Sequence, residues 1–209
     1  QVLALQETTI DFVNELKAAG IDELLPYSER SSSDGVYGNG VWSALPLSDA
    51  ASDDIGSSAS AMPAGTIEVT RPDDTTARLR LVSVHTCSPA LGYWALWERS
   101  ITEIGVVHER LAEDDGLNYV LLGDFNATYD HAPFREMLGE GTAAGKPRLH
   151  DAARECGAGI TSTWPANLEI PAFCSIDHVV TSDRVIATEV STVEVPGSDH
   201  LALIATLEL

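Results

Sequence analysis

The chain has 209 residues, of which 44% are apolar and 21% charged, a composition that excludes a disordered tail, a coiled coil and a collagen-like rod. Its 12 Lys and Arg against 32 Asp and Glu give a formal net charge of −20, which disfavours sequence-independent binding to duplex nucleic acid. A bound divalent cation would reverse the potential locally, so a phosphate-containing substrate remains open.

Taken in chain order, short apolar or alternating segments predict strands over residues 2–6, 40–45, 66–70, 77–85, 119–124, 175–181, 188–195 and 201–209. Helical periodicity is clearest over 9–19 and 91–111, where apolar residues recur at three- and four-residue steps. Strands with helices interposed at irregular intervals indicate a layered α/β or α+β fold.

Three segments carry further expectations. Residues 48–61 contain only Ser, Asp, Ala and Gly apart from Ile55, which predicts a mobile surface loop. The run at 119–122 has no polar face, so we expect a strand covered on both sides. Residues 201–209 carry apolar side chains on both faces and are expected to be interior as well.

Polar residues lie at one end of five of the predicted apolar strands. Charged groups in such places are costly unless they are paired or bound to a metal. If the first three strands point the same way and the last two are antiparallel neighbours, one rim of the sheets collects the following side chains: Glu7, His85, Asp124, Asn126, Asp177, Asp199 and His200.

The chain resembles the endonuclease/exonuclease/phosphatase superfamily, which includes DNase I-like nucleases, sphingomyelinases and inositol phosphatases. The resemblance rests on five strings in the same order and approximate spacing: Leu5-Gln6-Glu7, Val84-His85-Thr86, Gly123-Asp124-Phe125-Asn126, Ile176-Asp177-His178 and Ser198-Asp199-His200. It implies one catalytic domain over residues 1–209, folded as a four-layered α/β sandwich of two mixed sheets flanked by helices.

The resemblance also implies hydrolysis of a phosphoester, of phosphodiesterase, nuclease or phosphatase type, with a divalent cation. The cation is usually Mg²⁺, with Mn²⁺ or Ca²⁺ as alternatives. By resemblance, Glu7 is the principal metal ligand and Asp199 contributes directly or through water. Asp124 would orient or deprotonate the attacking water, and Asn126 would donate a hydrogen bond to the phosphate or the nucleophile.

Two histidines complete the expected site. His200 would lie beside the scissile phosphate, with Asp177 fixing its tautomer and favouring the charged ring. His85 would contact a phosphate oxygen or protonate the leaving group. Because neighbouring side chains of a strand point to opposite faces, Asp199 and His200 must lie in the loop before the last strand. His178 shares a strand face with apolar residues and is interpreted as structural.

Residues 125–128, 130–133, 163–165 and 195–200 are similar to an actinobacterial subgroup. Its members carry hydrophobic spans before the catalytic domain and present it outside the cell. The 209 residues contain no such span, so a membrane-anchored, extracytoplasmic location is expected only through segments absent from this chain.

Family members begin with a strand that ends in Asn, and Gln1 comes too late for it. We therefore expect the sandwich to lack this strand, to bind metal weakly, to have reduced or no activity and to self-associate through an open sheet edge. A catalytically silent module that binds a phosphorylated ligand remains the alternative to an enzyme. Cys87 and Cys174 could form a disulfide in an oxidising compartment. Substrate choice is assigned to the loops at 27–39, 48–65 and 139–148.

Overall fold

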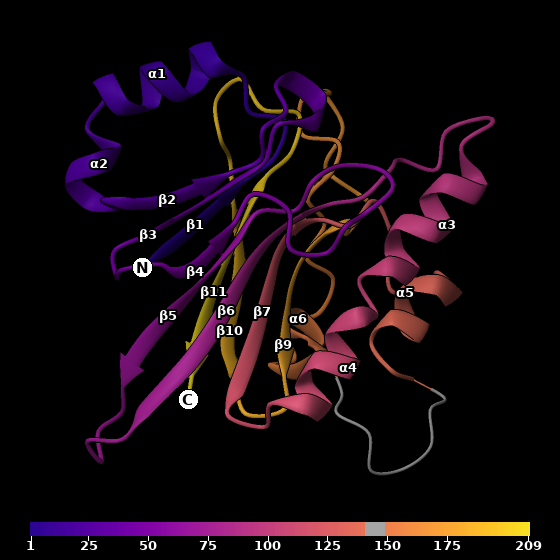
Figure 1. Ribbon diagram of the computed structural model, residues 1–209. Helices are drawn as coiled ribbons and strands as arrows, with labels where there is room; N and C mark the ends of the chain where they lie inside the picture. The colour runs from indigo at the N-terminus through magenta and orange to yellow at the C-terminus, as the bar shows by residue number, and fades with distance from the viewer. Residues whose placement is uncertain (141–148) are drawn as a thin grey trace.

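The computed structural model contains both helices and strands, as the sequence predicts, and the structure describes residues 1–140 and 149–209 (Figure 1). The strands are β1 (Val2–Leu5), β2 (Tyr27–Arg30), β3 (Gly40–Ser43), β4 (Ser48–Ala51), β5 (Ala64–Thr70), β6 (Thr76–His85), β7 (Leu117–Asp124), β8 (Leu149–Asp151), β9 (Asp177–Ser182), β10 (Ile186–Val193) and β11 (Ala202–Glu208). The helices are α1 (Ile10–Ala18), α2 (Ile21–Leu24), the 3-10 turn η1 (Gly35–Tyr37), α3 (Trp94–Glu103), α4 (Val106–Glu113), α5 (Ala132–Met137) and α6 (Ala152–Glu155).

One mixed sheet of six strands, in the order β4-β5-β6-β7-β9-β8, forms the centre of the molecule. The β6 and β7 strands are parallel, with His85 opposite Asp124, while the other pairs are antiparallel. In the antiparallel pair of β7 and β9, Asp124 lies opposite Asp177. Three of the predicted site residues therefore lie side by side on adjacent strands, at the same end of the sheet.

A second layer of strands packs against one face of this sheet. It consists of the three-stranded sheet β1-β3-β2 and the two-stranded sheet β10-β11. Between the two layers lies a cluster of buried aliphatic side chains that includes Val41 of β3, Leu81 of β6 and Val190 of β10. Among the described residues β1 pairs only with β3 and β11 only with β10, so each keeps one unpaired edge.

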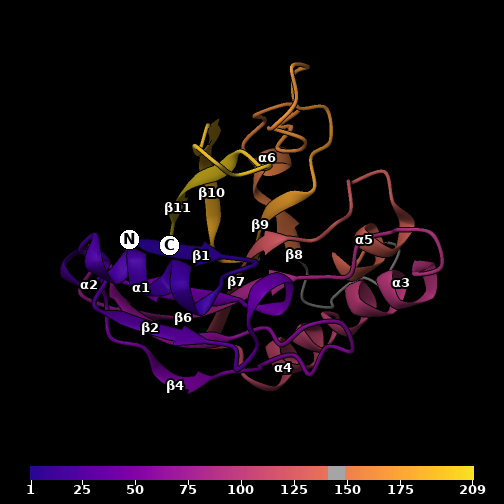
Figure 2. The ribbon, with the colours of Figure 1, turned by 90° about the horizontal axis from the view of Figure 1, so that it is seen from above.

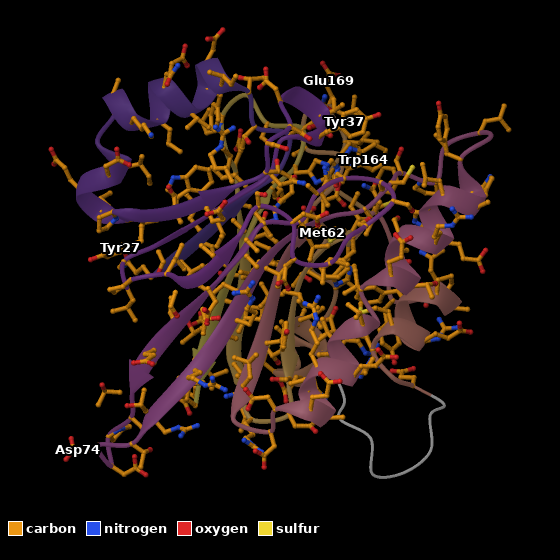
Figure 3. The ribbon with its side chains drawn as sticks, in the orientation of Figure 1. Tyr27, Tyr37, Met62, Asp74, Trp164 and Glu169 are labelled. Carbon is orange, nitrogen blue, oxygen red and sulfur yellow. The ribbon has the colours of Figure 1, made fainter. Side chains whose placement is uncertain are left out.

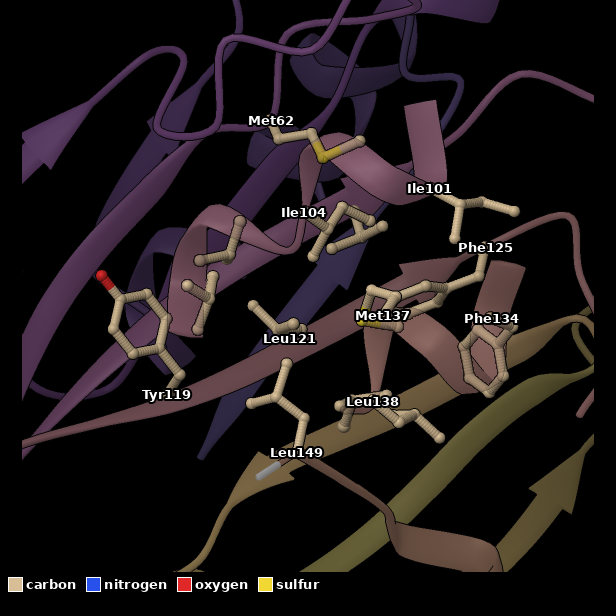
Figure 4. Close-up of a cluster of buried hydrophobic side chains, with 14 of the residues drawn as sticks. Met62, Ile101, Ile104, Tyr119, Leu121, Phe125, Phe134, Met137, Leu138 and Leu149 are labelled. Atoms are coloured by element: carbon tan, nitrogen blue, oxygen red, sulfur yellow. The ribbon is translucent and has the colours of Figure 1, made fainter. Parts of the chain in front are cut away.

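Helices cover the two outer surfaces, which gives the four layers of the expected sandwich. The α1 and α2 helices pack on β1 and β3 around Trp42. The α3, α4 and α5 helices pack on the large sheet around Ile101, Leu121 and Phe134 (Figure 4). Figure 2 looks down on the molecule and shows β10 and β11 on one side of β7 and α4 on the other.

The two-residue period of the strands decides which polar side chains face the second layer. Leu81 of β6, Val120 of β7 and Val179 of β9 are buried between the two layers of strands. An even number of residues separates each of them from the polar residue at the site end of its strand, namely His85, Asp124 and Asp177. Because side chains alternate along a strand, these three face the second layer too.

The structure corrects three expectations about individual segments. The pattern at 91–111 forms two helices, α3 and α4, which are separated at Gly105. The C-terminal strand β11 is interior on one face only, since Ile204 is 52% exposed. The expected loop at 27–39 contains β2 and η1, and the loop at 139–148 lies outside the described residues beyond residue 140.

Only part of the segment 48–61 is loop. It includes β4, and the buried carboxylate of Asp54 lies 2.6 Å from Arg80 Nη2 and 2.7 Å from Arg110 Nη1. The composition of the segment gave no sign of this order, because both arginines lie far away in the sequence. Two ion pairs therefore fix a segment that has little apolar surface of its own.

We expect Asp54→Asn to lower the free energy of unfolding by about 3 kcal/mol, because buried Arg80 would lose its counter-charge. Urea unfolding followed by circular dichroism measures the difference. The matched control is Asp115→Asn, which removes an exposed carboxylate 3.9 Å from Arg184 and is expected to change stability by less than about 1 kcal/mol. Equal losses in the two variants would contradict the prediction.

Candidate active site

The seven predicted site residues lie at one end of the sandwich and come from both layers of strands. Glu7 comes two residues after the end of β1, and Asp199 and His200 occupy the loop before β11, as expected. His85, Asp124 and Asp177 stand at the ends of strands of the large sheet, and Asn126 follows β7. In Figure 3, Tyr37 and Trp164 lie at this end of the molecule, and Asp74 lies at the opposite end.

A hydrogen bond between His200 and Asp177 joins the two layers. The distance from His200 Nδ1 to Asp177 Oδ2 is 2.7 Å. Burial opposes the charged ring, but the hydrogen bond to Asp177 and the negative charges of Asp177, Asp124 and Asp199 outweigh it and raise the pKa of His200 to about 9. His200 is therefore an imidazolium at neutral pH, with Nδ1 donating to Asp177.

His85 behaves in the opposite way. Burial first, and then the positive charge of His200, lower the pKa of His85 to about 4, although Asp177 opposes the shift. Its Nε2 lies 3.8 Å from both Glu7 Oε1 and Asp124 Oδ2, while its buried Nδ1 has no hydrogen-bond partner among residues 1–140 and 149–209. Since the ring is neutral at neutral pH, these contacts are not ion pairs.

Asp124 and Asn126 form a closed hydrogen-bonded turn. Asp124 Oδ1 accepts from the Asn126 backbone N–H at 2.7 Å, and Asp124 Oδ2 accepts from Asn126 Nδ2 at 3.0 Å. Burial, followed by the charge of Asp177, raises the pKa of Asp124 to about 7 against the opposing effects of His200 and Asn126. A carboxyl group with a pKa near neutrality is suited to proton transfer.

Asn126 lies after β7 as expected, and its side-chain amide is hydrogen-bonded within the protein. Its Nδ2 also donates to the carbonyl of Thr86 at 3.1 Å, so both amide hydrogens are engaged. Its backbone has φ of +48°, a left-handed conformation that Asn tolerates better than most residues. In this arrangement Asn126 orients Asp124 and offers no free amide hydrogen to a phosphate.

Glu7 and Asp199 provide hard oxygen donors at the mouth of the site. Glu7 has φ of +56°, and its carboxylate is 59% exposed. Burial, and then the charge of Asp199, raise the pKa of Glu7, with His200 opposing. A carboxylate whose ionisation is opposed by a neighbouring negative charge fits a divalent cation, and Mg²⁺ often uses only one or two carboxylates together with water and phosphate oxygens.

The part of the chain that the structure describes has no group of three or more His, Cys, Asp or Glu side chains arranged to hold a metal ion. Any cation bound by Glu7 and Asp199 would therefore complete its coordination with water or substrate oxygens. This is the usual situation for Mg²⁺, which gives up its water reluctantly.

Close packing of the backbone places Glu7. Gln6 Nε2 donates to Ser83 Oγ at 3.0 Å, across the two layers, and lies directly over Gly123. A Cβ at Gly123, which has φ of +141°, would come within 2.6 Å of that nitrogen and 2.1 Å of the Val84 carbonyl oxygen. Only glycine fits at this point of the sheet, and it lets Gln6 hold the end of β1.

Sequence reasoning noted the Thr163-Trp164-Pro165 string as a point of resemblance but gave it no role in the site. Thr163 Oγ1 accepts from the Asp177 N–H at 3.3 Å, and the Thr163 carbonyl accepts from the Leu201 N–H at 2.8 Å. Thr163 thus ties the strand of Asp177 to the segment of His200. No local pattern could have shown this, because the partners are 14 and 38 positions away.

Two segments that adjoin site residues in the sequence, one after His85 and one before Asp177, carry few charges and several exposed apolar side chains. Residues 86–97 contain no Asp, Glu, Lys or Arg, and residues 156–174 contain only Glu169. Leu91, Trp94 and Phe173 in these segments are more than half exposed.

All three cysteines are free in the structure, so Cys87 and Cys174 do not form a disulfide there.

We expect Asp177→Asn to lower the pKa of His200 from about 9 toward its ordinary 6.5, because the charge and hydrogen bond that raise it are removed or weakened. Titration of the histidine ring by NMR in the presence of EDTA measures the shift. An unchanged pKa in the folded variant would contradict the assignment.

The same shift has a consequence for stability. A raised pKa in the folded state stabilises the fold fully below about pH 6.5 and loses this contribution as the pH rises to about 9. In urea unfolding, the contribution of His200 should therefore decline between these two values. Asp177→Asn is expected to flatten this part of the pH profile.

The profile of the Endonuclease/Exonuclease/phosphatase family matches residues 1–200. No curated protein matches the sequence significantly. Among solved structures, the APE2 catalytic domain of Xenopus laevis is similar with a TM-score of 0.75 and 15% identity, over 99% of this chain and 82% of that one. Truncated TDP2 of Caenorhabditis elegans has a TM-score of 0.70 and 17% identity, over 99% of this chain and 83% of that chain.

A third similar structure is a mannosyl-6-phosphatase of Bacteroides thetaiotaomicron, with a TM-score of 0.65 and 16% identity over 100% of this chain and 85% of that one. At such identities the likeness bears on the fold, which is the DNase I-like sandwich. None of the helices in the described residues has the length and apolar character needed to cross a membrane.

Proposed function

Since this chain belongs to the endonuclease/exonuclease/phosphatase family, we propose that it hydrolyses phosphoester bonds with the help of a divalent cation, Mg²⁺ first and Mn²⁺ or Ca²⁺ as alternatives. The observation that carries the proposal is a pair of histidines whose pKa values are shifted in opposite directions. The charged ring of His200 is hydrogen-bonded to Asp177, and the neutral ring of His85 lies 3.8 Å from Asp124, whose pKa is near 7.

Glu7 and Asp199 would hold the cation. When bound, the ion neutralises charge that builds up on the phosphoryl oxygens. Asp124 is the group that orients the attacking water and takes its proton, since its pKa lies close to neutral pH. Asn126 keeps the Asp124 carboxylate in place through two hydrogen bonds.

His200 and His85 have different roles toward the phosphate. His200, held as an imidazolium by Asp177, lies beside the scissile phosphate and stabilises its negative charge. His85 is neutral and acts as a hydrogen-bond donor to a phosphate oxygen rather than as a general acid, because with a pKa of about 4 the ring keeps only one N–H at neutral pH and that proton is too weakly acidic to transfer.

The test is a panel of nitrophenyl phosphate monoesters and diesters, an oligonucleotide and sugar phosphates, assayed with Mg²⁺. Turnover that EDTA abolishes and excess Mg²⁺ restores supports the hydrolase. Binding of a panel member without turnover at any cation concentration would support the alternative, a catalytically silent module of the same fold. The chemical logic favours the enzyme, because a binding module has no need for a charged and a neutral histidine together.

The partner that we propose is a phosphoester that carries few further negative charges. Affinity for duplex DNA depends on Lys and Arg at the phosphates, and the segments 86–97 and 156–174 contain neither. Strong, sequence-independent binding of duplex DNA is therefore not part of the proposal. Self-association through the unpaired edges of β1 and β11 is part of it, and light scattering over a range of concentrations tests it.

We also propose that the chain works outside the cytoplasm, anchored by membrane segments of a longer polypeptide. The support is the similarity of residues 163–165 and 195–200 to the actinobacterial subgroup. Fractionation of cells that produce the full-length protein tests this location.

A further inference from the structure

His178 directly follows Asp177 but faces the other side of the large sheet. Its ring is 5% exposed and lies between two phenylalanines, with centroid distances of 5.6 Å to Phe125 and 4.4 Å to Phe134. The mechanism proposed above does not use it. The polar atoms of a side chain that is buried so deeply are usually hydrogen-bonded.

Both ring nitrogens of His178 face acceptors. Nε2 lies 2.8 Å from the carbonyl oxygen of Ala127, which can only accept, so Nε2 carries a hydrogen. Nδ1 lies 2.5 Å from Asp151 Oδ2. The other oxygen of Asp151 accepts from the Arg154 N–H at 3.1 Å, and such a bond favours the ionised carboxylate. The geometry thus corresponds to a doubly protonated ring beside an ionised carboxylate.

The charges around the ring agree with this state. Burial opposes the charge on His178, but the hydrogen bond and charge of Asp151, the Ala127 carbonyl and the charge of Asp177 outweigh it and raise its pKa. Burial likewise opposes ionisation of Asp151, but the bond and charge of His178, with the N–H groups of Arg154 and Ala153, lower the pKa of that carboxyl.

Ala127 belongs to the turn that holds Asp124 and Asn126. Three consecutive carbonyls of this turn each accept a hydrogen bond from the side chain of a different element. The Phe125 carbonyl accepts from Thr86 Oγ1, that of Asn126 from Trp97 Nε1 at 2.9 Å, and that of Ala127 from His178 Nε2. The turn is thereby fixed from the residue that follows β6, from α3 and from β9.

We propose that His178 is a positioning residue for the hydrolase: a buried imidazolium that joins Asp151 to the Ala127 carbonyl and so holds Asp124 in its reactive geometry. The inference rests on the proposed function for its catalytic consequence. The charged state itself does not depend on that function. It assigns a role to a histidine that sequence reasoning placed in the core.

The charge state is tested by long-range ¹H–¹⁵N NMR of the histidine rings in the full chain at pH 8. We expect His178 to show two protonated ring nitrogens, with its signals identified by their loss in His178→Gln. Asp151→Asn keeps an oxygen acceptor but removes the charge, and it is expected to convert the ring to the neutral form. A wild-type ring with one bare nitrogen at pH 8 would overturn the proposal.

The catalytic role is tested with His178→Phe, which keeps an aromatic ring between Phe125 and Phe134 but has no N–H group. We expect kcat to fall by about 10- to 100-fold and KM to change by less than about threefold, because the turn of Asp124 loses one anchor while substrate contacts stay. Amide exchange at Asn126 and Ala127 is expected to quicken.

His150→Phe is the matched control. His150 lies on the neighbouring strand β8, where its Nε2 is 2.6 Å from Asp183 at the surface, and its loss should leave kcat and the exchange at Asn126 unchanged. Folded His178→Phe with wild-type kcat and unchanged exchange would overturn the proposal. Failure of the proposed function would instead appear as absence of turnover in every variant, including the wild type.

Discussion

Replacing His200 with glutamine is expected to lower kcat/KM by about 10²- to 10⁴-fold on whichever substrate of the panel is turned over. The variant removes the imidazolium beside the phosphate and leaves the carboxylate of Asp177 without its partner at 2.7 Å. That uncompensated charge would lie close to Asp124 and further hinder its ionisation. Initial rates with saturating Mg²⁺ measure the effect.

The matched control is His150→Gln, which removes a histidine with a carboxylate partner at a similar distance, 2.6 Å, but on the surface. Its activity should equal that of the wild type. Circular dichroism of both variants confirms that they fold. A folded His200→Gln variant with activity within threefold of the wild type would remove His200 from the mechanism.

Asp124→Asn is expected to lower kcat by about 10²- to 10⁴-fold while the fold persists. The side chain keeps its shape but can no longer take a proton from water. It also offers one acceptor oxygen where Asn126 now donates twice, from its backbone N–H and from Nδ2, so the turn loses a hydrogen bond. Pre-steady-state and steady-state rates at several pH values measure the loss.

Asp130→Asn serves as its control, because it removes an exposed carboxylate from the same connection after β7. We expect no change in kcat from it. If Asp124→Asn kept wild-type turnover, another group would have to accept the proton of the water, and the near-neutral pKa of Asp124 would have no part in catalysis.

Much of the fold was predictable because its strands carry strong local signals. The eight predicted strands are all present, with bounds within about two residues at most ends, and the N-cap Thr9 begins α1 as the pattern suggested. The strands that were missed, β2, β4 and β8, are short. They have polar or mixed composition, so only tertiary contacts distinguish them from loops.

The candidate site was predictable to a different degree. The positions of His85, Asp124 and Asp177 follow from strand ends and the two-residue period, both of which can be read locally. The contacts of Asn126, Thr163 and His178 do not follow from any local pattern. They depend on partners that the fold brings from other elements, such as Thr86, Asp151 and Leu201.

Protonation states were the least accessible from sequence. His85 and His200 are the same residue type at the ends of apolar segments, yet one titrates near 4 and the other near 9. The difference arises because His85 is buried without a hydrogen-bonding carboxylate and His200 has Asp177 at 2.7 Å. The sequence shows neither the burial nor the distance.

The site draws Glu7 and His200 from one layer of strands and Asp124 and Asp177 from the other, and only packed side chains such as Val190 separate the layers. The size of these buried aliphatic side chains consequently sets the distance between the catalytic groups of the two layers. A smaller or larger residue between the two layers would change turnover without touching the substrate. A screen for activity in this chain should therefore find altered enzymes among substitutions of buried residues as well as among substitutions at the site.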